Sequence, residues 1–166
     1  MFIRDAQQED YSAIIRLNGS EVEHTSAMDL DRLRYLVSLS SYFRVAQVQD
    51  WVVAFLLAMP AGAPYHNDNF SWFSSRYDSF LYIDRIVVER GFQGSGIGSL
   101  LYQDVFTFAR EANIPLLTCE INTVPPNTPS VAFHSRHGFS EAGSQWLDDG
   151  KDRKSTRLNS SHGIIW

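Results

Sequence analysis

The feature that most constrains this chain is the stretch from Leu81 to Leu101, LYIDRIVVERGFQGSGIGSLL. Its first half is apolar and β-branched, which predicts a buried strand over residues 80–88. Its second half, from Gln93 to Gly98, brings three glycines to the start of a helical pattern. Glycines let a ligand approach the backbone closely, and the first N–H groups of a helix have no partner within it. The stretch therefore predicts a phosphate or pyrophosphate site at a helix N-terminus.

Length and composition fit a single globular domain. The 166 residues are 44% hydrophobic and 20% charged, which is ordinary for a chain that builds a proper core. No apolar run approaches the roughly 20 residues that span a bilayer, and the N-terminus is too polar for a signal peptide. The single cysteine, Cys119, leaves no internal disulfide and no cysteine-based metal cluster. We therefore expect a cytoplasmic protein with no membrane partner.

The charge is unevenly distributed along the chain. The formal net charge of −5 argues against nucleic acid as the main partner. Residues 1–150 hold 10 basic and 18 acidic residues, whereas residues 151–166 hold four basic residues and one acid. In so acidic a body, the predicted phosphate site must depend on backbone N–H groups more than on a basic patch.

The apolar pattern predicts one α/β domain. Strands are expected at residues 2–4, 42–48, 51–59, 80–88, 115–121 and 139–147, and helices at 11–17, 28–39, 97–113 and 130–137. Residues 60–79 form a long aromatic connection, which is either a functional loop or is pinned to the body by its rings. The order favours a single-domain mixed, mostly antiparallel sheet flanked by helices.

The C-terminal stretch differs from the rest of the chain. Residues 152–162, DRKSTRLNSSH, show no apolar periodicity and do not continue the strand pattern. They resemble the translation of a common sequencing-library adapter. We therefore expect a domain at residues 1–150 followed by a non-native or disordered tail at 151–166 without function, with the natural partner strand of residues 139–147 missing. A genuine flexible tail is the alternative.

Three phosphate-binding patterns compete for the glycine-rich segment. A Walker loop ends in Gly-Lys-Ser/Thr, which does not occur here, so nucleotide hydrolysis has little support. The dinucleotide fingerprint needs a third glycine where Ser99 stands, and an early strand of a βαβ repeat that this chain does not supply. The third pattern, Gln/Arg-x-x-Gly-x-Gly/Ala, is matched by residues 93–98.

A second block supports the third pattern. About 30 residues further on, residues 127–139 read NTPSVAFHSRHGF and fit N-x-x-S-x-x-F-[Y]-x-x-x-G-F. Together the two blocks resemble the GNAT superfamily of N-acetyltransferases, over about residues 2–147. The resemblance implies a GNAT-like acyl-CoA N-acyltransferase fold with acetyl-CoA as co-substrate. The glycine-rich loop would hold the pyrophosphate, and the end of the strand at 80–88 would pair with the pantetheine arm.

The resemblance also assigns residues to the coenzyme. The strands at 80–88 and 115–121 are expected to splay, so that the arm lies between them and an N–H near Val88 faces the thioester carbonyl. Asn122 would approach the arm, and Asn127 would cap the following helix and touch the coenzyme. The expected coenzyme-binding residues are Ile86, Val87, Val88, Gln93, Gly94, Ser95, Gly96, Ile97, Gly98, Asn122, Asn127 and Phe133.

Asp84 is the candidate base that takes the proton of the attacking amine. It interrupts an apolar strand, and strand alternation puts it on the same face as Tyr82, Ile86 and Val88. Partial burial would raise the pKa of such a carboxyl toward a useful range. A structural ion pair is the alternative, although alternation directs the adjacent Arg85 to the other face.

His134 is the candidate acid that protonates the leaving thiolate, because it stands where the family pattern usually has tyrosine. A histidine on a helix face near solvent is the alternative. Cys119 lies in an apolar strand and is expected to be a buried, inert thiol, which favours direct transfer in a ternary complex. The remaining histidines lack acidic or cysteine partners at metal-ligand spacing, so no metal site is expected.

These observations predict an N-acetyltransferase that moves the acetyl group of acetyl-CoA to a primary amine, on a small molecule or a peptide. Acids at Glu21, Glu23, Asp68 and Asp78 would suit a cationic acceptor or are merely solvated. A non-catalytic acyl-CoA-binding or sensing module is the alternative. A nucleotide-binding domain is a third reading, in which ATP or NAD would stabilise the protein more than CoA. The sequence leaves a homodimer open.

Overall fold

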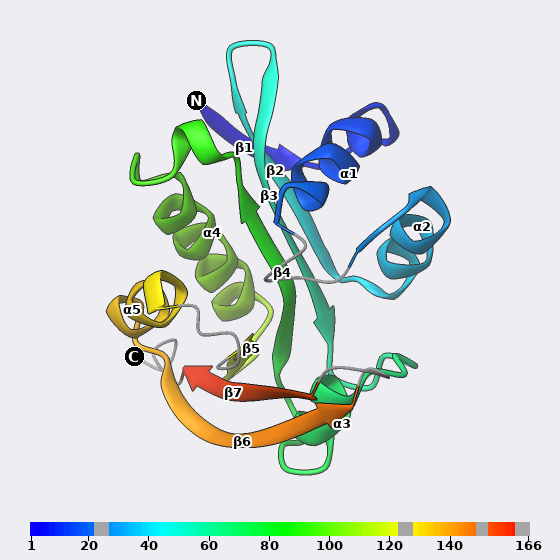
Figure 1. Cartoon of the computed structure of the whole chain (residues 1–166), viewed down its shortest axis with the longest axis vertical. Helices are drawn as coiled ribbons and strands as arrows, with labels where there is room; N and C mark the ends of the chain where they lie inside the picture. The colour runs from blue at the N-terminus through cyan, green and yellow to red at the C-terminus, as the bar shows by residue number, and fades with distance from the viewer. Residues whose placement is uncertain (22–26, 123–127, 149–152, 162–166) are drawn as a thin grey trace.

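The computed structural model describes residues 1–21, 27–122, 128–148 and 153–161. Helices and strands are interspersed along the chain (Figure 1). They are β1 (Phe2–Asp5), η1 (Gln8–Asp10), α1 (Tyr11–Gly19), α2 (Leu30–Leu39), β2 (Tyr42–Val48), β3 (Trp51–Pro60), α3 (Asp68–Ser74), β4 (Leu81–Val88), η2 (Arg90–Phe92), α4 (Ile97–Glu111), β5 (Leu117–Asn122), α5 (Thr128–Arg136), β6 (Ser140–Asp148) and β7 (Arg153–Ser161).

The strands form one sheet in the order β1-β2-β3-β4-β5-β7-β6. In the described part of the chain β4 and β5 are parallel, and each other neighbouring pair is antiparallel. The helix α4 connects the parallel strands, as a crossover must. The predicted single-domain mixed, mostly antiparallel sheet flanked by helices is thus confirmed.

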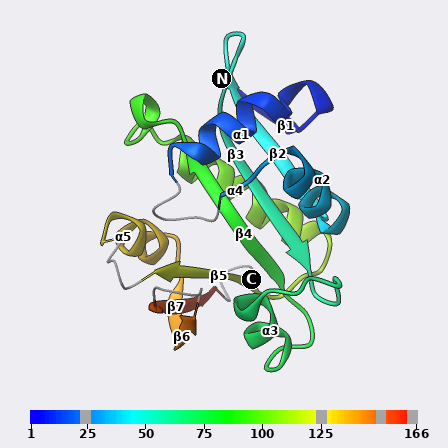
Figure 2. The same cartoon turned by 45° about the vertical axis from the view of Figure 1, so that its right-hand side comes forward.

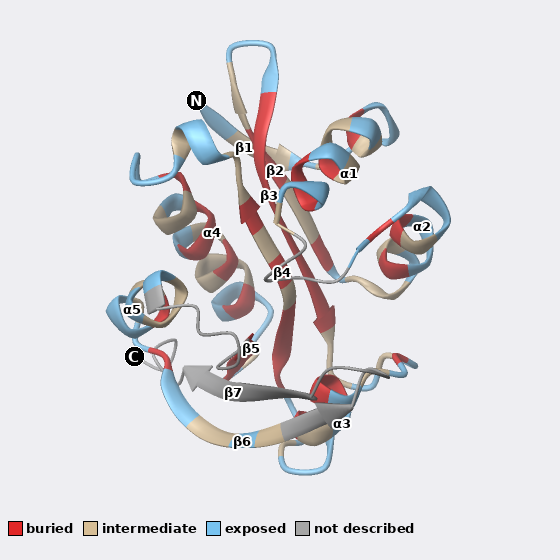
Figure 3. Ribbon diagram, in the orientation of Figure 1, coloured by how far each residue is buried: buried red, intermediate tan, exposed pale blue. Residues whose placement is uncertain are grey.

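Helices cover both faces of the sheet, which divides the hydrophobic core in two. Apolar side chains of α1, α2 and α3 pack on one face, and those of α4 pack on the other. Figure 2 shows α1 and α2 in front of the sheet, with α4 behind it. β3 lies between the two clusters, so its residues from Val52 to Met59 are all buried (Figure 3). A strand buried on both faces reads as a continuous apolar run, as this one does.

Local signals end the elements close to where the sequence predicts. Gln49 adopts a positive φ of 54° in the β2–β3 turn, and Asn113 does so at 57° just after α4. Gly138, with φ 85°, follows α5. Asp29 caps α2 by accepting a hydrogen bond from the backbone N–H of Arg32 at 2.8 Å. None of the helices in the described ranges is long and apolar enough to cross a bilayer.

Two segments differ from the expectation. The connection at 60–79 contains the short helix α3, whose Phe70 and Phe73 are buried in the core. A Cβ added to Gly143 would lie 2.5 Å from the Trp72 ring, so α3 also packs directly on β6. Most of the aromatic rings therefore pin this segment to the body.

The second difference lies at the C-terminus. Residues 153–161 form β7, which pairs with β5 on one side and β6 on the other. No strand was expected there, because a polar sequence without alternation carries no strand signal. Its backbone nevertheless supplies hydrogen bonds to both neighbours. That these residues are non-native stays a prediction.

Candidate active site

The glycine-rich turn opens α4 with an exposed backbone. Gly94 and Gly96 have φ of 82° and 88°, and Gly96 is the N-cap of the helix. A side chain rarely adopts such angles, so glycine is required by the backbone itself. A Cβ added at either position would meet nothing within 4 Å. The outer side of the turn is therefore open, and the helix N-terminus can accept an anion there.

Gly98 serves a different purpose. A Cβ at this position would lie 3.1 Å from the ring of Phe133, so the missing side chain lets α5 approach α4. The Phe133 ring also packs against Tyr102, with ring centroids 5.2 Å apart. The Phe133 ring therefore lines one side of the glycine turn and is held in place by packing between α4 and α5.

A gap between β4 and β5 leads to this turn. Their pairing ends at Ile83 and Cys119, although β4 continues to Val88 and β5 to Asn122. Beyond that point the described residues of β4 pair with β3, and those of β5 pair with β7. One edge of β4 is therefore left without a strand, as the predicted splaying requires. An extended amide chain could add to such an edge.

The segment between β4 and the glycine turn is fastened to its surroundings. Gln93 donates from Nε2 to the carbonyl oxygen of Val88 at 3.1 Å, and the Ser95 hydroxyl donates to the carbonyl of Phe92. Both side chains thus hold the turn's shape. Arg90 reaches the residues that follow α1, with 3.4 Å between its Nε and Oε1 of Glu21. Glu21 therefore has a partner, and Glu23 lies outside the described residues.

Asp84 occupies a β-bulge in β4. Leu57 of β3 faces Arg85, and the next residue, Ala58, faces Ile83. Asp84 is the extra residue between them, without a partner on β3. A bulge resets the alternation of side chains along a strand. The expectation that Arg85 points to the other face is therefore wrong.

Arg85 is the direct partner of Asp84. Its Nε lies 2.8 Å from Oδ2 of Asp84, and both side chains are almost fully buried, at 4% and 3% exposure. Arg85 also donates to Oδ1 of Asn18 in α1 at 2.9 Å, and Tyr65 donates its hydroxyl proton to Oδ1 of Asp84 at 2.6 Å. Asp84 thus forms a structural ion pair, which was the alternative to its prediction as the catalytic base.

The Asp84 side chain also does not share a face with all the residues that strand alternation predicted. Tyr82 and Val87 lie in the core cluster under α1 and α2, whereas Ile86 and Val88 pack against the cluster on the α4 side. Tyr65, the partner of Asp84, belongs to the first cluster. Asp84 therefore shares a face with Tyr82 but not with Ile86 and Val88, again because of the bulge.

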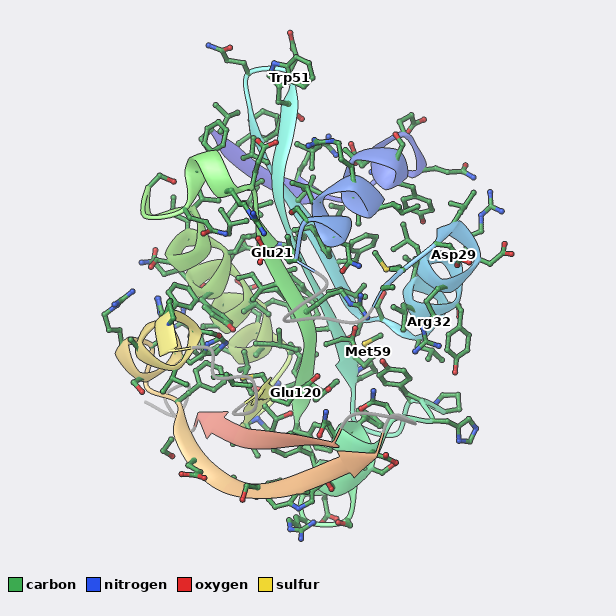
Figure 4. All side chains as sticks on the ribbon, in the orientation of Figure 1. Glu21, Asp29, Arg32, Trp51, Met59 and Glu120 are labelled. Carbon is green, nitrogen blue, oxygen red and sulfur yellow. The ribbon has the colours of Figure 1, made fainter. Side chains whose placement is uncertain are left out.

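Glu120 is the acid that the sequence analysis missed. It follows Cys119, the last residue of β5 that pairs with β4, so it stands where the two strands part. Tyr82 donates a hydrogen bond to its Oε2 from the adjacent strand. Figure 4 labels Glu120 on β5, near the foot of β4. A lone acid inside an apolar strand, the signal that singled out Asp84, was present here too.

The surroundings of Glu120 favour its neutral form. Burial, followed by the nearby negative charge of Asp84, raises the pKa of the Glu120 carboxyl to about 8. The hydrogen bond from Tyr82 and the charge of Arg85 act in the opposite direction but do not cancel this effect. A carboxyl that titrates near neutral pH can take up a proton during a reaction.

His134 is buried between α4 and α5 and is only 5% exposed. Its Nδ1 lies 2.7 Å from the carbonyl oxygen of Ser130, so the ring proton is on Nδ1, and Nε2 accepts from the Tyr102 hydroxyl. Burial lowers the pKa of His134 to about 4. At neutral pH the ring is neutral, and its one N–H proton is engaged by the backbone.

The other predicted site residues are placed as follows. Asn122 is the last residue of β5, opposite Thr156 in the register, and Asn127 lies outside the described residues. Cys119 is buried, and burial raises the pKa of its thiol well above the usual value, as expected for an inert thiol. Among the described residues, no three acidic, histidine or cysteine side chains are grouped to hold a metal ion.

Known proteins share this architecture. The sequence matches the model of the acetyltransferase (GNAT) family over residues 3–139. A ribosomal-protein-alanine N-acetyltransferase from Brucella melitensis has a similar fold, with a TM-score of 0.75 and 23% identity over 98% of this chain and 99% of the other. Protein smu.2055 from Streptococcus mutans gives a TM-score of 0.77 and 16% identity, over 98% and 99% of the two chains. No curated protein matches the sequence.

One similar structure carries the coenzyme. It is yncA from Salmonella typhimurium, determined with its cofactor acetyl-CoA, with a TM-score of 0.71 and 19% identity over 98% of this chain and 93% of the other. Because the family model covers most of the chain, the protein belongs to the acetyltransferase (GNAT) family, which transfers acyl groups with acetyl-CoA. The open glycine turn and the free edge of β4 fit that coenzyme.

The glycine turn can be tested directly. We expect Gly96→Glu to weaken CoA binding by at least about a hundredfold, because a side chain and a negative charge enter the place of the pyrophosphate. Isothermal titration with CoA measures the change. Gly62→Glu is the matched control, since Gly62 also has a positive φ, of 87°, and open space around its Cβ. Equal CoA affinity in the two variants would show that the cradle is elsewhere.

Proposed function

We propose that this protein is an N-acetyltransferase that transfers the acetyl group of acetyl-CoA to a primary amine by direct attack in a ternary complex. The observation that carries the proposal is the position of Glu120. Its carboxyl lies where β4 and β5 part, beside the free strand edge, and its pKa is raised to about 8 by burial. An acid with this pKa suits the removal of a proton from an amine near neutral pH.

Each part of the groove has a role in this proposal. Acetyl-CoA, when bound, supplies the thioester. The N–H groups of residues 94–98 hold the pyrophosphate, and the edge of β4 from Ile86 to Val88 holds the amide arm. Glu120 receives the amine proton as the bond from nitrogen to the acetyl carbon forms and the carbon–sulfur bond breaks. The thiolate takes its proton from water, because the N–H of His134 is engaged by Ser130.

Asp84 acts on this chemistry through Glu120. Held by Arg85 and Tyr65, its carboxylate is a fixed negative charge that raises the pKa of Glu120. We therefore assign the base to Glu120 and a positioning role to Asp84. The sequence prediction that Asp84 is itself the base remains the competing assignment, and the pH dependence of the two variants below distinguishes the two.

A coenzyme-sensing module without catalysis is the second candidate. The observation that favours it is His134, which replaces the tyrosine of the family pattern and is buried as a neutral ring. Such a module would bind acetyl-CoA tightly and release no thiol with any amine. The thiol-release assay with a panel of amines therefore decides between the two functions.

Glu120→Gln tests the proposed base. In the wild type, kcat/KM should rise with pH and level off above about 8, because the carboxyl must be ionised to accept a proton. The substitution should remove this dependence and lower kcat/KM by about a hundredfold or more. Thiol release is measured across the pH range. Glu111→Gln, at the exposed end of α4, is the control and should behave as the wild type. An unchanged profile in Glu120→Gln would exclude the assignment.

Asp84→Asn separates the two acids. Without the negative charge of Asp84, Glu120 loses its proton more easily, so the rise in kcat/KM should move to lower pH. The substitution also leaves Arg85 buried without its counter-charge, which should lower the free energy of unfolding by about 3 kcal/mol. Asp50→Asn, in the exposed β2–β3 turn, is the control. If the pH dependence disappeared instead of moving, Asp84 would be the base.

A further inference from the structure

Arg136 is an exposed cation beside the glycine turn. It is the last residue of α5. Its guanidinium carbon lies 5.9 Å from the ring centre of Phe133, and the same ring would lie 3.1 Å from a Cβ added to Gly98. The guanidinium and the start of α4 therefore contact one aromatic ring from two sides, and the printed distances join the cation to the proposed pyrophosphate site.

A hydrogen bond brings the same end of α5 to the start of α4. Nε2 of His137 lies 3.0 Å from the hydroxyl oxygen of Ser99, which belongs to the first turn of α4. Consecutive Cα atoms are about 3.8 Å apart, so Arg136 also lies near that turn. Burial, followed by the charge of Arg136, lowers the pKa of His137, which leaves the imidazole neutral at pH 7. Arg136 thus supplies the permanent positive charge at this end of α5.

Arg136 differs from the other arginines near the glycine turn because it has no acidic partner. Nη1 of Arg16 lies 3.0 Å from Oε1 of Glu89. Nε of Arg90 lies 3.4 Å from Oε1 of Glu21. Within the described ranges, no carboxylate forms an ion pair with Arg136. A contact with a ring face does not use the N–H donors of a guanidinium, so these donors can bind an anion.

Coenzyme A carries a phosphate for which the glycine turn supplies no partner. In the proposed complex the pyrophosphate takes the N–H groups of residues 94–98. The 3′-phosphate is attached to the ribose next to the pyrophosphate, and a phosphate monoester carries a charge of about −1.5 to −2 at pH 7. A helix N-terminus offers only about half a positive charge. A cation beside the turn would therefore stabilise this second phosphate.

We propose that Arg136 binds the 3′-phosphate of coenzyme A and so makes the protein select the coenzyme over its dephospho form. The inference rests on the proposed function, in which the pyrophosphate lies on the glycine turn. A guanidinium pairs with phosphate oxygens through parallel, charge-assisted hydrogen bonds, which are stronger than neutral ones. The contact with Phe133 restricts the side chain before the coenzyme arrives, which reduces the entropy lost on binding.

Calorimetric titration with CoA and with dephospho-CoA, which lacks only the 3′-phosphate, tests the proposal. Wild-type protein should bind CoA about tenfold more tightly. Arg136→Gln should lower the affinity for CoA to that for dephospho-CoA and leave the latter unchanged. Arg136→Lys should keep part of the preference, because lysine binds phosphate as a point charge.

Arg110→Gln is the matched control. Arg110 is an exposed arginine in the last turn of α4, about 20 Å from the N-terminus of that helix. This variant should keep the full preference for CoA. The melting temperature of each variant without ligand is measured beside the titrations, and it should equal that of the wild type because both arginines are exposed.

The outcomes separate the inference from the function on which it rests. Equal affinities of the wild type for the two ligands, or a preference that survives Arg136→Gln, would overturn the inference. An equal loss of affinity for both ligands in Arg136→Gln would also overturn it, because the cation would then bind the pyrophosphate. Absence of thiol release with any amine would overturn the proposed acetyl transfer and leave the 3′-phosphate site standing. A wild type that binds neither ligand would overturn both.

Discussion

The candidate site depends on one feature of the sheet: the pairing between β4 and β5 ends after Ile83 and Cys119, and the two strands separate. Up to that point the two strands satisfy each other's backbone groups. Beyond it the described residues of β4 pair only with β3 and those of β5 only with β7, so the edge of β4 that faced β5 is left for another extended chain. The glycine turn follows that edge directly, so in the proposed complex a strand-like arm and a pyrophosphate would be bound by consecutive parts of one segment. The same parting leaves Glu120 beside the free edge.

The electrostatics of the site follow from how the charges of Asp84, Arg85 and Glu120 are paired. Asp84 and Glu120 are both acids, and among the described residues only Arg85 forms an ion pair with one of them, Asp84. Arg85 pairs with Asp84 at the bulge, which leaves the half-buried Glu120 with a negative neighbour. The two acids thus have different surroundings. Asp84 is held in an ion pair, whereas burial and a negative neighbour raise the pKa of Glu120 to about 8.

Periodicity and glycine chemistry predicted the strands β1 to β6, the helices other than α3, and the glycine turn, because each of these is encoded over a short stretch. The bulge at Asp84 was not predictable, because it arises from the pairing of β4 with β3. For the same reason the Arg85 side chain was predicted to point to the other face, although it forms an ion pair with Asp84. Glu120 was overlooked although it interrupts its strand as Asp84 does. The burial of His134 depends on Tyr102, 32 residues earlier in the chain, and the strand β7 depends on edges that other strands provide.

The structure of the complex with CoA tests the central claim most directly. The pantetheine arm should lie along the edge of β4 at residues 86–88, with the pyrophosphate on the N–H groups of residues 94–98 and the sulfur near the point where β4 and β5 part, facing Glu120. A coenzyme bound elsewhere would contradict the claim. So would a complex in which β4 and β5 pair along their full length and the groove is closed.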